Sequence, residues 1–546
     1  MTGKRANRGQ SARPPGDVTS AQSTDVAGSP LSAGPAWDYA PAPESRDIVS
    51  IAAEYGLFTG GEFGPAADGR QFPTINPATE EPLALVALAG PADVDRAVAA
   101  ARHAYEDVWG PMPGAERAKY LYRIARILQE RAREFAVLES LDNGKPIRES
   151  RDVDVPLAAA HFFYYAGWAD KLEYAGIGGA SGAGVTGRSD GAGVTGGNGG
   201  ASRTGVAGGA GRGMAPRPLG VAGQVIPWNF PLLMAAWKLA PALATGNTCV
   251  LKPAETTPLT ALLLAEVCQQ AGLPPGVVNV LTGAGQTGSA LVNHPGVNKI
   301  AFTGSTEVGK EISRAVAGTG KRLTLELGGK AANVVFDDAP VDQAVEGIVN
   351  GIFFNQGHVC CAGSRLLVQE SVADTVVERL RDRLATLRLG DPLDKNTDIG
   401  AINSREQLDK INALAAAGQA EGAQRWSPPC QLPERGYWFP PTVFTGVSQS
   451  YRIAREEIFG PVLSVLTFRT PEEAVAKANN TPYGLSAGVW TEKGSRILWM
   501  AQRLRAGVVW ANTYNRFDPA SPFGGYRESG FGREGGRHGL AAYLDA

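Results

Sequence analysis

The sequence predicts an α/β fold in which parallel sheets are covered by helices on both faces. From Pro218 onward, short strand-like apolar runs alternate with amphipathic helical segments, which is the pattern of a parallel sheet with crossover helices. The chain has 546 residues and 43% of them are apolar. Because one hydrophobic core rarely serves so long a chain, we expect two or more domains with large cores.

The elements of this alternating region follow one another in order. Residues 247–253 (NTCVLKP) form a strand-like run, and residues 257–272 form a helical segment that ends at a glycine followed by two prolines. The runs VVNVL and KIAFTGS predict two further strands, and TEVGKEISRAVAG predicts a helix after the second of them. Sheets of this type bind dinucleotides at the carboxyl ends of their strands.

The preceding part of the chain contains two tracts of biased composition. Residues 1–36 are rich in Ser, Gly, Pro and Ala, so we expect a disordered tail. Residues 37–175 carry amphipathic helical patterns. Residues 176–213 are glycine-rich and repeat the hexamer GAGVTG, which predicts a flexible insertion. Its GxGxxG-like matches do not indicate a phosphate loop, because no strand precedes them and no helix follows.

Composition narrows the possible partners and the cellular setting. The 52 basic and 54 acidic side chains leave a formal charge of −2, so neither a nucleic acid nor an acidic membrane is expected as a partner. No run of eighteen apolar residues occurs, and we expect a soluble chain. The five cysteines are sparse and odd in number, which favours a reducing, cytoplasmic setting. No spacing of Cys and His predicts a metal site.

Two stretches at strand ends are candidate cofactor sites. TGSTEVG (303–309) lies where a strand becomes a helix, and backbone N–H groups at that helix start would favour a pyrophosphate. The alternative is an ordinary turn that Ser305 or Thr306 caps. Lys252 and Glu255 follow another strand and could hold ribose hydroxyls, or they could form a solvated pair.

The stretch FNQGHVCCAGSR (354–365) places Cys360 and Cys361 side by side just after a predicted helix, VDQAVEGIVNGIF. The apolar positions of that helix should anchor it to the core, and Gly357 would free the backbone to present one sulfur to a cleft. In an extended segment neighbouring side chains point to opposite faces, so only one of the two cysteines could face a reacting carbon.

Seven motifs, taken together, resemble those of the NAD(P)-dependent aldehyde dehydrogenase superfamily from about Tyr55 to Tyr543. They are PWNFP (227–231), KPAE (252–255), FTGSTEVG (302–309), ELGGK (326–330), NQGHVCCAG (355–363), EEIFGP (456–461) and PFGGYRESGFGRE (522–534). The resemblance implies a Rossmann-type parallel-sheet cofactor domain, an α/β catalytic domain and a reduced oligomerisation element.

The resemblance also implies an enzymatic reaction. Cys360 would attack an aldehyde, with the side-chain amide of Asn229 and the Cys360 backbone N–H stabilising the oxyanion. After hydride transfer, Glu326 would act as general base for hydrolysis of the thioester, unless it forms only an ion pair with Lys330. Glu534 matches a carboxylate thought to help relay protons.

The implied cofactor is NAD, with NADP possible, because Glu255 would repel a 2′-phosphate. The residues that would contact it are Trp228, Lys252, Glu255, Gly304, Ser305, Gly309, Leu327, Glu457 and Phe459. The implied substrate tunnel is mostly apolar and comprises Phe230, Met234, Trp237, Val359, Cys361, Tyr514, Arg516, Phe517 and Phe523. Arg516 departs from the apolar residue that relatives usually have there, so it either turns to solvent or binds an anionic substrate tail.

The implied domains are a discontinuous NAD-binding domain (37–175 and 214–327), a catalytic domain (328–510) and a C-terminal return segment (511–546) without the usual final strand. The glycine-rich insertion replaces the hairpin with which relatives oligomerise, so a homo-oligomer, or a hetero-oligomer with a related chain, could differ from the common dimer or tetramer. Two alternative functions remain: a catalytically weak assembly or scaffold protein, and a dehydrogenase that passes the acyl group to coenzyme A.

Overall fold

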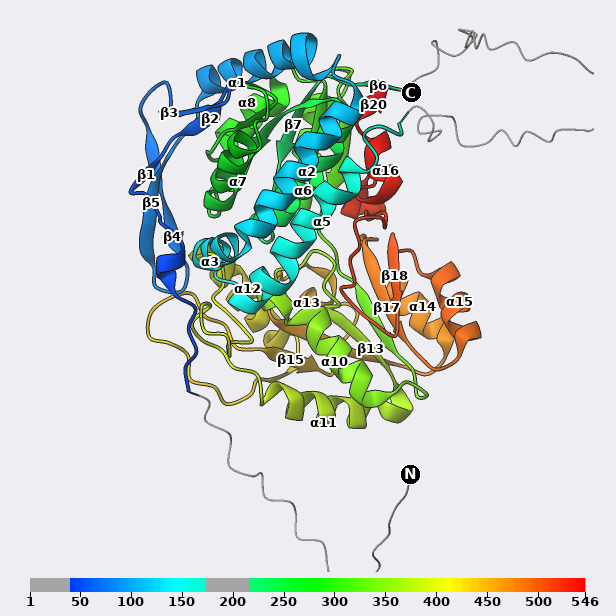
Figure 1. The fold of residues 1–546 in the computed structure, drawn as a ribbon. Coiled ribbons are helices and arrows are strands. Elements are labelled where there is room, and N and C mark those ends of the chain that lie inside the picture. Colours follow the sequence, from blue (N-terminus) through cyan, green and yellow to red (C-terminus); the bar gives the residue numbers. More distant parts are fainter. Residues whose placement is uncertain (1–39, 173–215, 546) are drawn as a thin grey trace, which may run out of the picture. The chain divides into compact units, whose positions relative to one another are not determined.

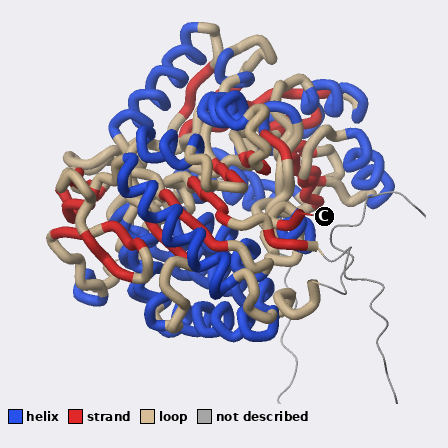
Figure 2. Tube along the Cα trace, turned by 90° about the horizontal axis from the view of Figure 1, so that it is seen from above, coloured by secondary structure: helices blue, strands red, loops and turns tan. Residues whose placement is uncertain are grey.

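The computed structural model describes residues 40–172 and 216–545. The predicted disordered tail (1–36) and the predicted glycine-rich insertion (176–213) both lie outside the described residues. Two large sheets and two small ones organise the rest, and Figure 2 shows their strands flanked by helices. No helix among the described residues is both long and apolar enough to cross a bilayer.

The larger sheet has eight strands in the order β19-β11-β10-β7-β8-β9-β2-β3. Their bounds are β2 Leu57–Thr59, β3 Glu62–Gly64, β7 Val221–Val225, β8 Thr248–Lys252, β9 Val278–Val280, β10 Lys299–Thr303, β11 Arg322–Glu326 and β19 Gly530–Phe531. The strands β7 to β11 run parallel. Because β7, the first of these five, lies between β8 and β10, the strand order reverses beside it, and such a switch point is where open α/β sheets bind ligands.

Alternation of side chains explains why helices cover both faces of this sheet. Val221 and Val250 belong to one core with residues of α1 (Pro91–Ala104), whereas their neighbours Ala222 and Cys249 belong to the core that includes α6 (Pro231–Ala244). Successive strand residues point to opposite faces, so each strand contributes to both cores. In Figure 1, α2 (Gly114–Glu130), α5 (Val155–Ala166) and α6 lie side by side on the second face.

The second large sheet has seven strands, all from residues 332 to 511, in the order β14-β15-β16-β13-β12-β17-β18. Its strands run parallel except β14, which pairs antiparallel with β15 at the edge. Their bounds are β12 Ala332–Val335, β13 Arg365–Gln369, β14 Gln424–Trp426, β15 Thr442–Thr445, β16 Val462–Phe468, β17 Ser486–Trp490 and β18 Val508–Ala511. α10 (Val341–Ile352) and α11 (Ala373–Leu384) share one core with this sheet, while α14 (Pro471–Asn479) and α15 (Gly494–Arg503) share another.

Short elements complete the described chain. The remaining helices are α3 Ala132–Asn143, α4 Ile147–Glu149, α7 Leu259–Gln270, α8 Gly285–Asn293, α9 Thr306–Val316, α12 Arg405–Ala420, α13 Arg452–Arg455 and α16 Gly536–Ala541. The remaining strands are β1 Glu54–Tyr55, β4 Gln71–Asn76, β5 Glu81–Ala87, β6 Arg217–Pro218 and β20 Leu544–Asp545. β20 pairs antiparallel with β6, so the return segment, expected to lack its final strand, ends in a two-residue one.

The strands and helices predicted between residues 247 and 318 are confirmed as β8, α7, β9, β10 and α9, each within a few residues of the expected bounds. The apolar segment PLLMAAWKLAPALA is the wholly buried helix α6. The helix predicted before the cysteine pair is α10, and its apolar positions are buried apart from the half-buried Val341. The periodic apolar pattern was therefore sufficient to place these elements.

Candidate active site

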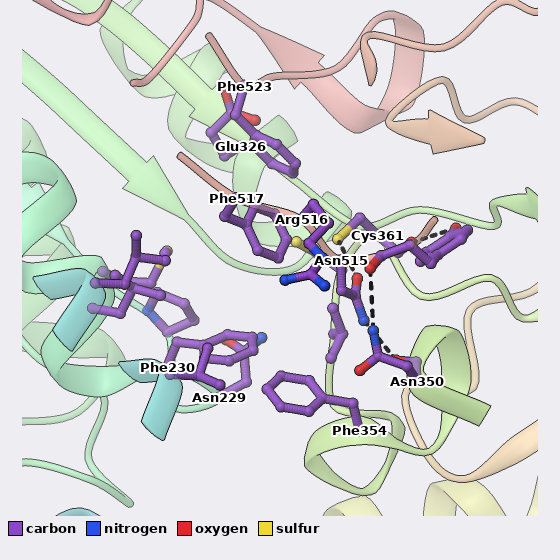
Figure 3. Close-up of a pocket in the computed structure, with 18 of the residues that line it drawn as sticks. Asn229, Phe230, Glu326, Asn350, Phe354, Cys361, Asn515, Arg516, Phe517 and Phe523 are labelled. Carbon is purple, nitrogen blue, oxygen red and sulfur yellow. Dashed lines mark hydrogen bonds between the residues drawn. The ribbon is translucent and has the colours of Figure 1, made fainter. Parts of the chain in front are cut away.

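A cavity of about 1240 Å³ lies at the carboxyl ends of β7, β10 and β11 and also receives residues that follow α10 and β18. Asn229, Glu326 and Cys360, the three residues predicted to be catalytic, all line it. Figure 3 shows Asn229 and Glu326 with several aromatic residues around the open space. Both large sheets thus contribute side chains to one pocket.

The turn that carries Cys360 has an unusual backbone. After α10, Asn355 and Gln356 adopt left-handed conformations with φ of 49° and 52°, and Gly357 follows with φ of 74°. A Cβ atom at Gly357 would lie 2.1 Å from the carbonyl oxygen of Gly460, so only glycine fits this close backbone approach. The turn directs the half-buried Cys360 into the cavity.

The cysteine pair is not extended as predicted, because residues 360 and 361 form a turn. Both cysteines line the cavity, although Cys361 is buried. The carbonyl oxygen of Cys361 accepts hydrogen bonds of 2.9 Å from the hydroxyls of Ser486 and Tyr514. These contacts fix the second cysteine in the cavity wall.

Hydrogen bonds from three directions hold this turn. The side-chain amide of Asn355 donates to the carbonyl oxygen of Asn229 at 2.7 Å, and its backbone N–H donates to Glu149 Oε2 at 2.9 Å. The side chain of Gln356 donates to the carbonyl oxygen of Ala401 at 2.9 Å. Buried hydrogen bonds of this kind favour one conformation, which compensates for the left-handed residues, although Oδ1 of Asn355 and Oε1 of Gln356 accept no hydrogen bond from the described residues.

Donors for an oxyanion are present beside Cys360. Asn229 is 4% exposed, and its Nδ2 donates to the carbonyl oxygen of His358 at 2.8 Å. An amide nitrogen has two N–H groups, so this bond orients the side chain and leaves the second N–H. Within residues 40–172 and 216–545, the backbone N–H of Cys360 has no oxygen acceptor. Both donors on which the prediction depends therefore lie at the cavity.

Glu326 is the last residue of β11 and is 4% exposed. Neither of its carboxylate oxygens has a hydrogen-bond partner among the described residues, and it forms no ion pair with Lys330. Burial raises the pKa of Glu326 well above its ordinary value, and the charge of Glu534 raises it further, whereas Lys238 acts in the opposite direction. A carboxylate without partners beside a cavity is free to exchange a proton.

Glu534 and Lys238 form a buried ion pair behind Glu326. Lys238 comes from α6 and is wholly buried, and the backbone of Glu534 pairs with that of Phe523 in both directions, with N–O distances of 2.7 and 2.8 Å. Glu534 also lines the cavity. Glu534 thus contributes to the cavity wall, and Lys238 contributes to the buried helix that packs on the larger sheet.

The thiol of Cys360 is not activated by its own surroundings. A hydrogen bond with the Cys361 side chain, followed by burial, raises the pKa of Cys360 well above that of an ordinary thiol. The backbone N–H of Cys361 lowers this pKa, but no cationic side chain is among the causes of the shift, so the thiol form is favoured over the thiolate. Nucleophilic attack therefore requires a base that removes this proton.

A buried charge cluster beneath the turn was missed by the sequence analysis. The Lys145 ammonium contacts Asp154, lies 3.6 Å from Glu139 and is 4.3 Å from the centre of the Phe230 ring. Glu139 accepts a hydrogen bond of 3.2 Å from the backbone N–H of Leu232. These residues come from a segment with no sequence similarity to a site motif, and only tertiary contacts bring them under Asn229 and Phe230.

Six of the nine residues predicted to contact the cofactor line the cavity, namely Trp228, Gly304, Ser305, Leu327, Glu457 and Phe459. Lys252, Glu255 and Gly309 do not. The Lys252 ammonium is buried, donates to the carbonyl oxygen of Pro253 at 2.8 Å and lies 3.6 Å from the exposed Glu255 carboxylate. A Cβ at Gly309 would lie 2.5 Å from Leu327 Cδ2, so this glycine allows α9 to pack closely on the strand end.

The residues at the switch point fit a dinucleotide. The hydroxyl of Ser305 caps α9 by accepting from the Val308 N–H at 3.3 Å, as the capping alternative predicted, and the helix start remains open to the cavity. Glu457 Oε1 accepts from the Gly329 N–H at 2.9 Å, and a Cβ at Gly328 would lie 2.2 Å from Glu457 Oε2. Burial raises the pKa of Glu457 to about 7. The strand-to-helix turn at Ser305 suits a pyrophosphate, and the carboxylate of Glu457 beside glycines suits the hydroxyls of a ribose.

All nine residues predicted for the substrate tunnel line the cavity, including Arg516 and Tyr514. Aromatic rings pack around it: Trp237 lies 5.4 Å from Phe523 and 6.2 Å from Phe517, and Phe230 stacks on Phe354 at 6.2 Å. Phe354 was not predicted, although it directly precedes the NQGHVCC motif and could have been found there. The wall is suited to an apolar or aromatic substrate body.

A parallel sheet with this strand order, and a cavity at its carboxyl edge that a cysteine, an amide and a carboxylate line, is typical of an oxidoreductase that uses a dinucleotide. Comparison with known proteins gives the family. The sequence matches the aldehyde dehydrogenase family over residues 64–546. The chain therefore belongs to the aldehyde dehydrogenase family, and it is an enzyme that oxidises aldehydes with NAD.

Similar proteins cover nearly the whole chain. The putative aldehyde dehydrogenase DhaS of Bacillus subtilis (strain 168) is 46% identical over 491 residues, which are 90% of this chain and 94% of the relative. The mitochondrial aldehyde dehydrogenase of Homo sapiens is 43% identical over 509 residues, 92% of this chain and 93% of the relative. The structure of an aldehyde dehydrogenase from Bacillus cereus in complex with NAD+ has a TM-score of 0.83 at 40% identity, covering 93% of this chain and 98% of the other.

Proposed function

We propose that Cys360, Asn229 and Glu326 carry out the reaction, and that its product is a free carboxylic acid. The observation that supports this most strongly is that these three residues line one cavity while both oxygens of Glu326 have no hydrogen-bond partner in the part of the chain that the structure describes. A structural glutamate would be expected to use its oxygens, because a buried carboxylate without hydrogen bonds is destabilising.

In the first step the Cys360 Sγ atom bonds to the aldehyde carbon, and the thiol proton passes to a base, for which Glu326 is the candidate. The carbonyl oxygen becomes an oxyanion that the second Asn229 N–H and the Cys360 N–H stabilise. A preorganised donor of this kind contributes about 3–4 kcal/mol in the transition state. The thiohemiacetal is then positioned against the switch point of the larger sheet.

Trp228, Gly304, Ser305, Leu327, Glu457 and Phe459 would hold NAD, which supplies the hydride acceptor when bound. Loss of hydride leaves a thioester on Cys360. Once Glu326 has passed the thiol proton to Glu534, it removes a proton from water and the water oxygen bonds to the acyl carbon. The carbon–sulfur bond then breaks, which releases the carboxylic acid and leaves Cys360 as a thiolate. The ion pair of Lys238 and Glu534 lies where it could accept the proton from Glu326.

NADH formation tests this proposal directly. Wild type and Cys360→Ala would be assayed with a panel of aldehydes, with and without coenzyme A. We expect NADH from the wild type without coenzyme A, a free acid as product, and no NADH from Cys360→Ala although it still binds NAD. An acyl-coenzyme A product, or wild-type turnover that requires coenzyme A, would instead support the acyl-transferring alternative. Failure of the wild type with every aldehyde would support the scaffold alternative.

We also propose the division of the chain that the sequence indicated, with an NAD-binding domain formed by 37–175 and 214–327 and a catalytic domain formed by 328–510. The strand content of the two large sheets supports this division.

The chain is proposed to act in the cytoplasm as an oligomer of its own copies or with a related chain. All five cysteines are unpaired, in keeping with a reducing setting. Light scattering coupled to size-exclusion chromatography measures the assembly.

A further inference from the structure

Arg516 is a basic side chain on the wall of a largely aromatic cavity. It follows Asn515 and precedes Phe517 in the loop after β18, and it lines the cavity together with both neighbours. Figure 3 shows its side chain extending from the loop into the open space between Phe517 and Asn515. The residue is also exposed, so it lines the cavity while remaining accessible to solvent.

Among residues 40–172 and 216–545, the guanidinium of Arg516 has no acidic partner. No hydrogen bond or ion pair joins the guanidinium to any residue in the described part of the chain. The backbone of Arg516 does form a hydrogen bond, because its carbonyl oxygen accepts from Trp510 Nε1 at 3.1 Å. A guanidinium has five N–H donors in a planar fork that matches a carboxylate. This fork is available to a ligand in the cavity.

The loop that carries Arg516 is held in place on both sides. Asn515 Nδ2 donates to the carbonyl oxygen of Asn350 at 2.7 Å, and Asn350 Nδ2 donates to the carbonyl oxygen of Tyr514 at 3.1 Å. Asn515 has a left-handed φ of 53°, a strained conformation that persists only where surrounding contacts enforce it. The backbone of Arg516 is therefore fixed relative to α10 and to the turn that follows it.

Among the described residues that line the cavity, Arg516 is an unpaired cation on the substrate side. The lining carboxylates Asp152 and Glu346 are paired with Arg151 and Arg383, at 2.6 Å each. The exposed Asp342 lies in the first turn of α10, where the helix dipole stabilises a carboxylate. The other basic lining residue, Lys410, comes from α12 beside Gln407, whose side chain contacts the backbone of Phe459 on the cofactor side.

We infer that Arg516 is a specificity-determining residue and that this enzyme prefers aldehydes with a carboxylate at the end remote from the aldehyde group, separated from it by an apolar or aromatic body. The inference rests on the proposed function, because it assumes that the aldehyde carbon reaches Cys360. The aromatic wall would hold the body of the substrate, and one guanidinium would bind one carboxylate in a bidentate pair. A phosphate dianion would leave a second charge without a partner.

Two aldehydes of similar shape, 4-formylbenzoate and its methyl ester, distinguish the effect of the carboxylate charge from the effect of substrate shape. The quantity measured is the ratio of their kcat/KM values, from NADH formation, in wild type, Arg516→Leu, Arg516→Lys and Arg314→Leu. Arg314 is an exposed arginine of α9 that does not line the cavity, so its variant controls for the loss of one surface charge. A benzaldehyde with a 4-trimethylammonium group tests the opposite preference.

We expect the wild type to favour the carboxylate, Arg516→Leu to lower the ratio about tenfold, and Arg516→Lys to keep part of the preference. Added salt should lower the wild-type ratio because it screens this partly exposed pair. Arg314→Leu should leave the ratio within about twofold of wild type. A wild type that prefers the ester or the cationic aldehyde, or an Arg516→Leu ratio equal to that of Arg314→Leu, would overturn the inference.

A second measurement does not depend on turnover. Calorimetric binding of 4-formylbenzoate to Cys360→Ala would be compared with binding to the double variant Cys360→Ala/Arg516→Leu. We expect about tenfold weaker binding to the double variant, and equal binding would overturn the inference. If the wild type forms no NADH from any aldehyde of the panel, the proposed function fails, while this comparison still decides whether Arg516 recognises a carboxylate.

Discussion

The backbone N–H of Asn355 donates a 2.9 Å hydrogen bond to Oε2 of Glu149, a residue 206 positions earlier in the chain. Asn355 adopts a left-handed conformation five residues before Cys360, and Glu149 is buried at the end of α4. Through this bond the helical segment under the cavity determines the path of the turn that presents the sulfur. The position of the nucleophile therefore depends on a carboxyl group that does not itself line the cavity.

Removal of this acceptor should weaken both folding and catalysis. Glu149→Ala leaves the buried N–H of Asn355 without a partner, and we expect the free energy of unfolding to fall by about 1–3 kcal/mol. Urea denaturation measures this change. Glu149→Gln keeps an oxygen acceptor and should lose much less, so equal destabilisation of the two variants would contradict the role assigned to the bond.

The stability of the wild type relative to Glu149→Gln should also depend on pH. Burial raises the pKa of Glu149 to about 8, with Asp154 also raising it and the charges of Lys145 and Arg148 lowering it. Between its ordinary value of 4.5 and about 8, the folded protein holds a proton that the unfolded chain has lost. The stabilisation is therefore complete at low pH and is lost as the pH rises toward 8.

Glutamine does not titrate, so the difference in unfolding free energy, wild type minus Glu149→Gln, should decrease from about pH 5.5 to about pH 8.5. The slope cannot exceed about 1.4 kcal/mol per pH unit for one proton. Urea titrations of both proteins at several pH values give this slope. A difference that is constant or that increases with pH would show that Glu149 is ionised in the folded protein.

A substitution at Gly357 should displace the nucleophile. An alanine there would combine the left-handed φ of 74° with a Cβ atom 2.1 Å from the Gly460 carbonyl oxygen. Because backbone lies on both sides, the turn must move, and a misplacement of about 1 Å is expected to lower kcat about 100-fold. Gly318 has a similar φ of 76° and open space around it, so Gly318→Ala controls for backbone strain alone. Similar kcat values for the two variants would contradict this reasoning.

The sequence was sufficient for those parts of the fold that depend on local periodicity. The alternation of apolar runs placed β8, α7, β10 and α9, and the helix before the cysteines is α10 as predicted. The resemblance to a known family indicated many of the lining residues, since all three predicted catalytic residues and the entire predicted tunnel line one cavity.

Features that depend on contacts between distant segments could not be predicted in the same way. Asn355 and Gln356 are left-handed without being glycine, and no local pattern marks them, because Glu149 and Ala401 supply the bonds that enforce this conformation. Likewise Lys145 reaches the Phe230 ring only in the folded chain. The extended backbone predicted for residues 360 and 361 was wrong for the same reason, because contacts between distant segments hold a turn there.

Cofactor choice should respond to Glu255. Its exposed carboxylate lies 3.6 Å from Lys252, outside the lining of the cavity, and would repel a 2′-phosphate. We expect Glu255→Gln to raise the ratio of kcat/KM for NADP over NAD about tenfold. Glu311→Gln removes an exposed carboxylate of α9 and serves as the control. An unchanged ratio in Glu255→Gln would place the 2′ position of the ribose away from this residue.

Glu326 offers a way to separate thioester formation from its hydrolysis. In Glu326→Gln, water loses its general base, and we expect steady-state turnover to fall about 100- to 10,000-fold. Since the pKa of Glu326 is raised well above its ordinary value, wild-type turnover should increase with pH as this carboxyl group loses its proton, and the variant should lack that limb of the profile.

The same variant should still form one equivalent of NADH rapidly if another group can take the thiol proton, and stopped-flow absorbance measures this burst. A burst followed by very slow turnover assigns Glu326 to hydrolysis alone. Loss of the burst as well would mean that Glu326 also deprotonates Cys360, whose own surroundings keep the thiol protonated. Normal steady-state turnover with an unchanged pH profile would exclude Glu326 as the base, and Glu534, the next carboxylate in the cavity wall, would then be the residue to test.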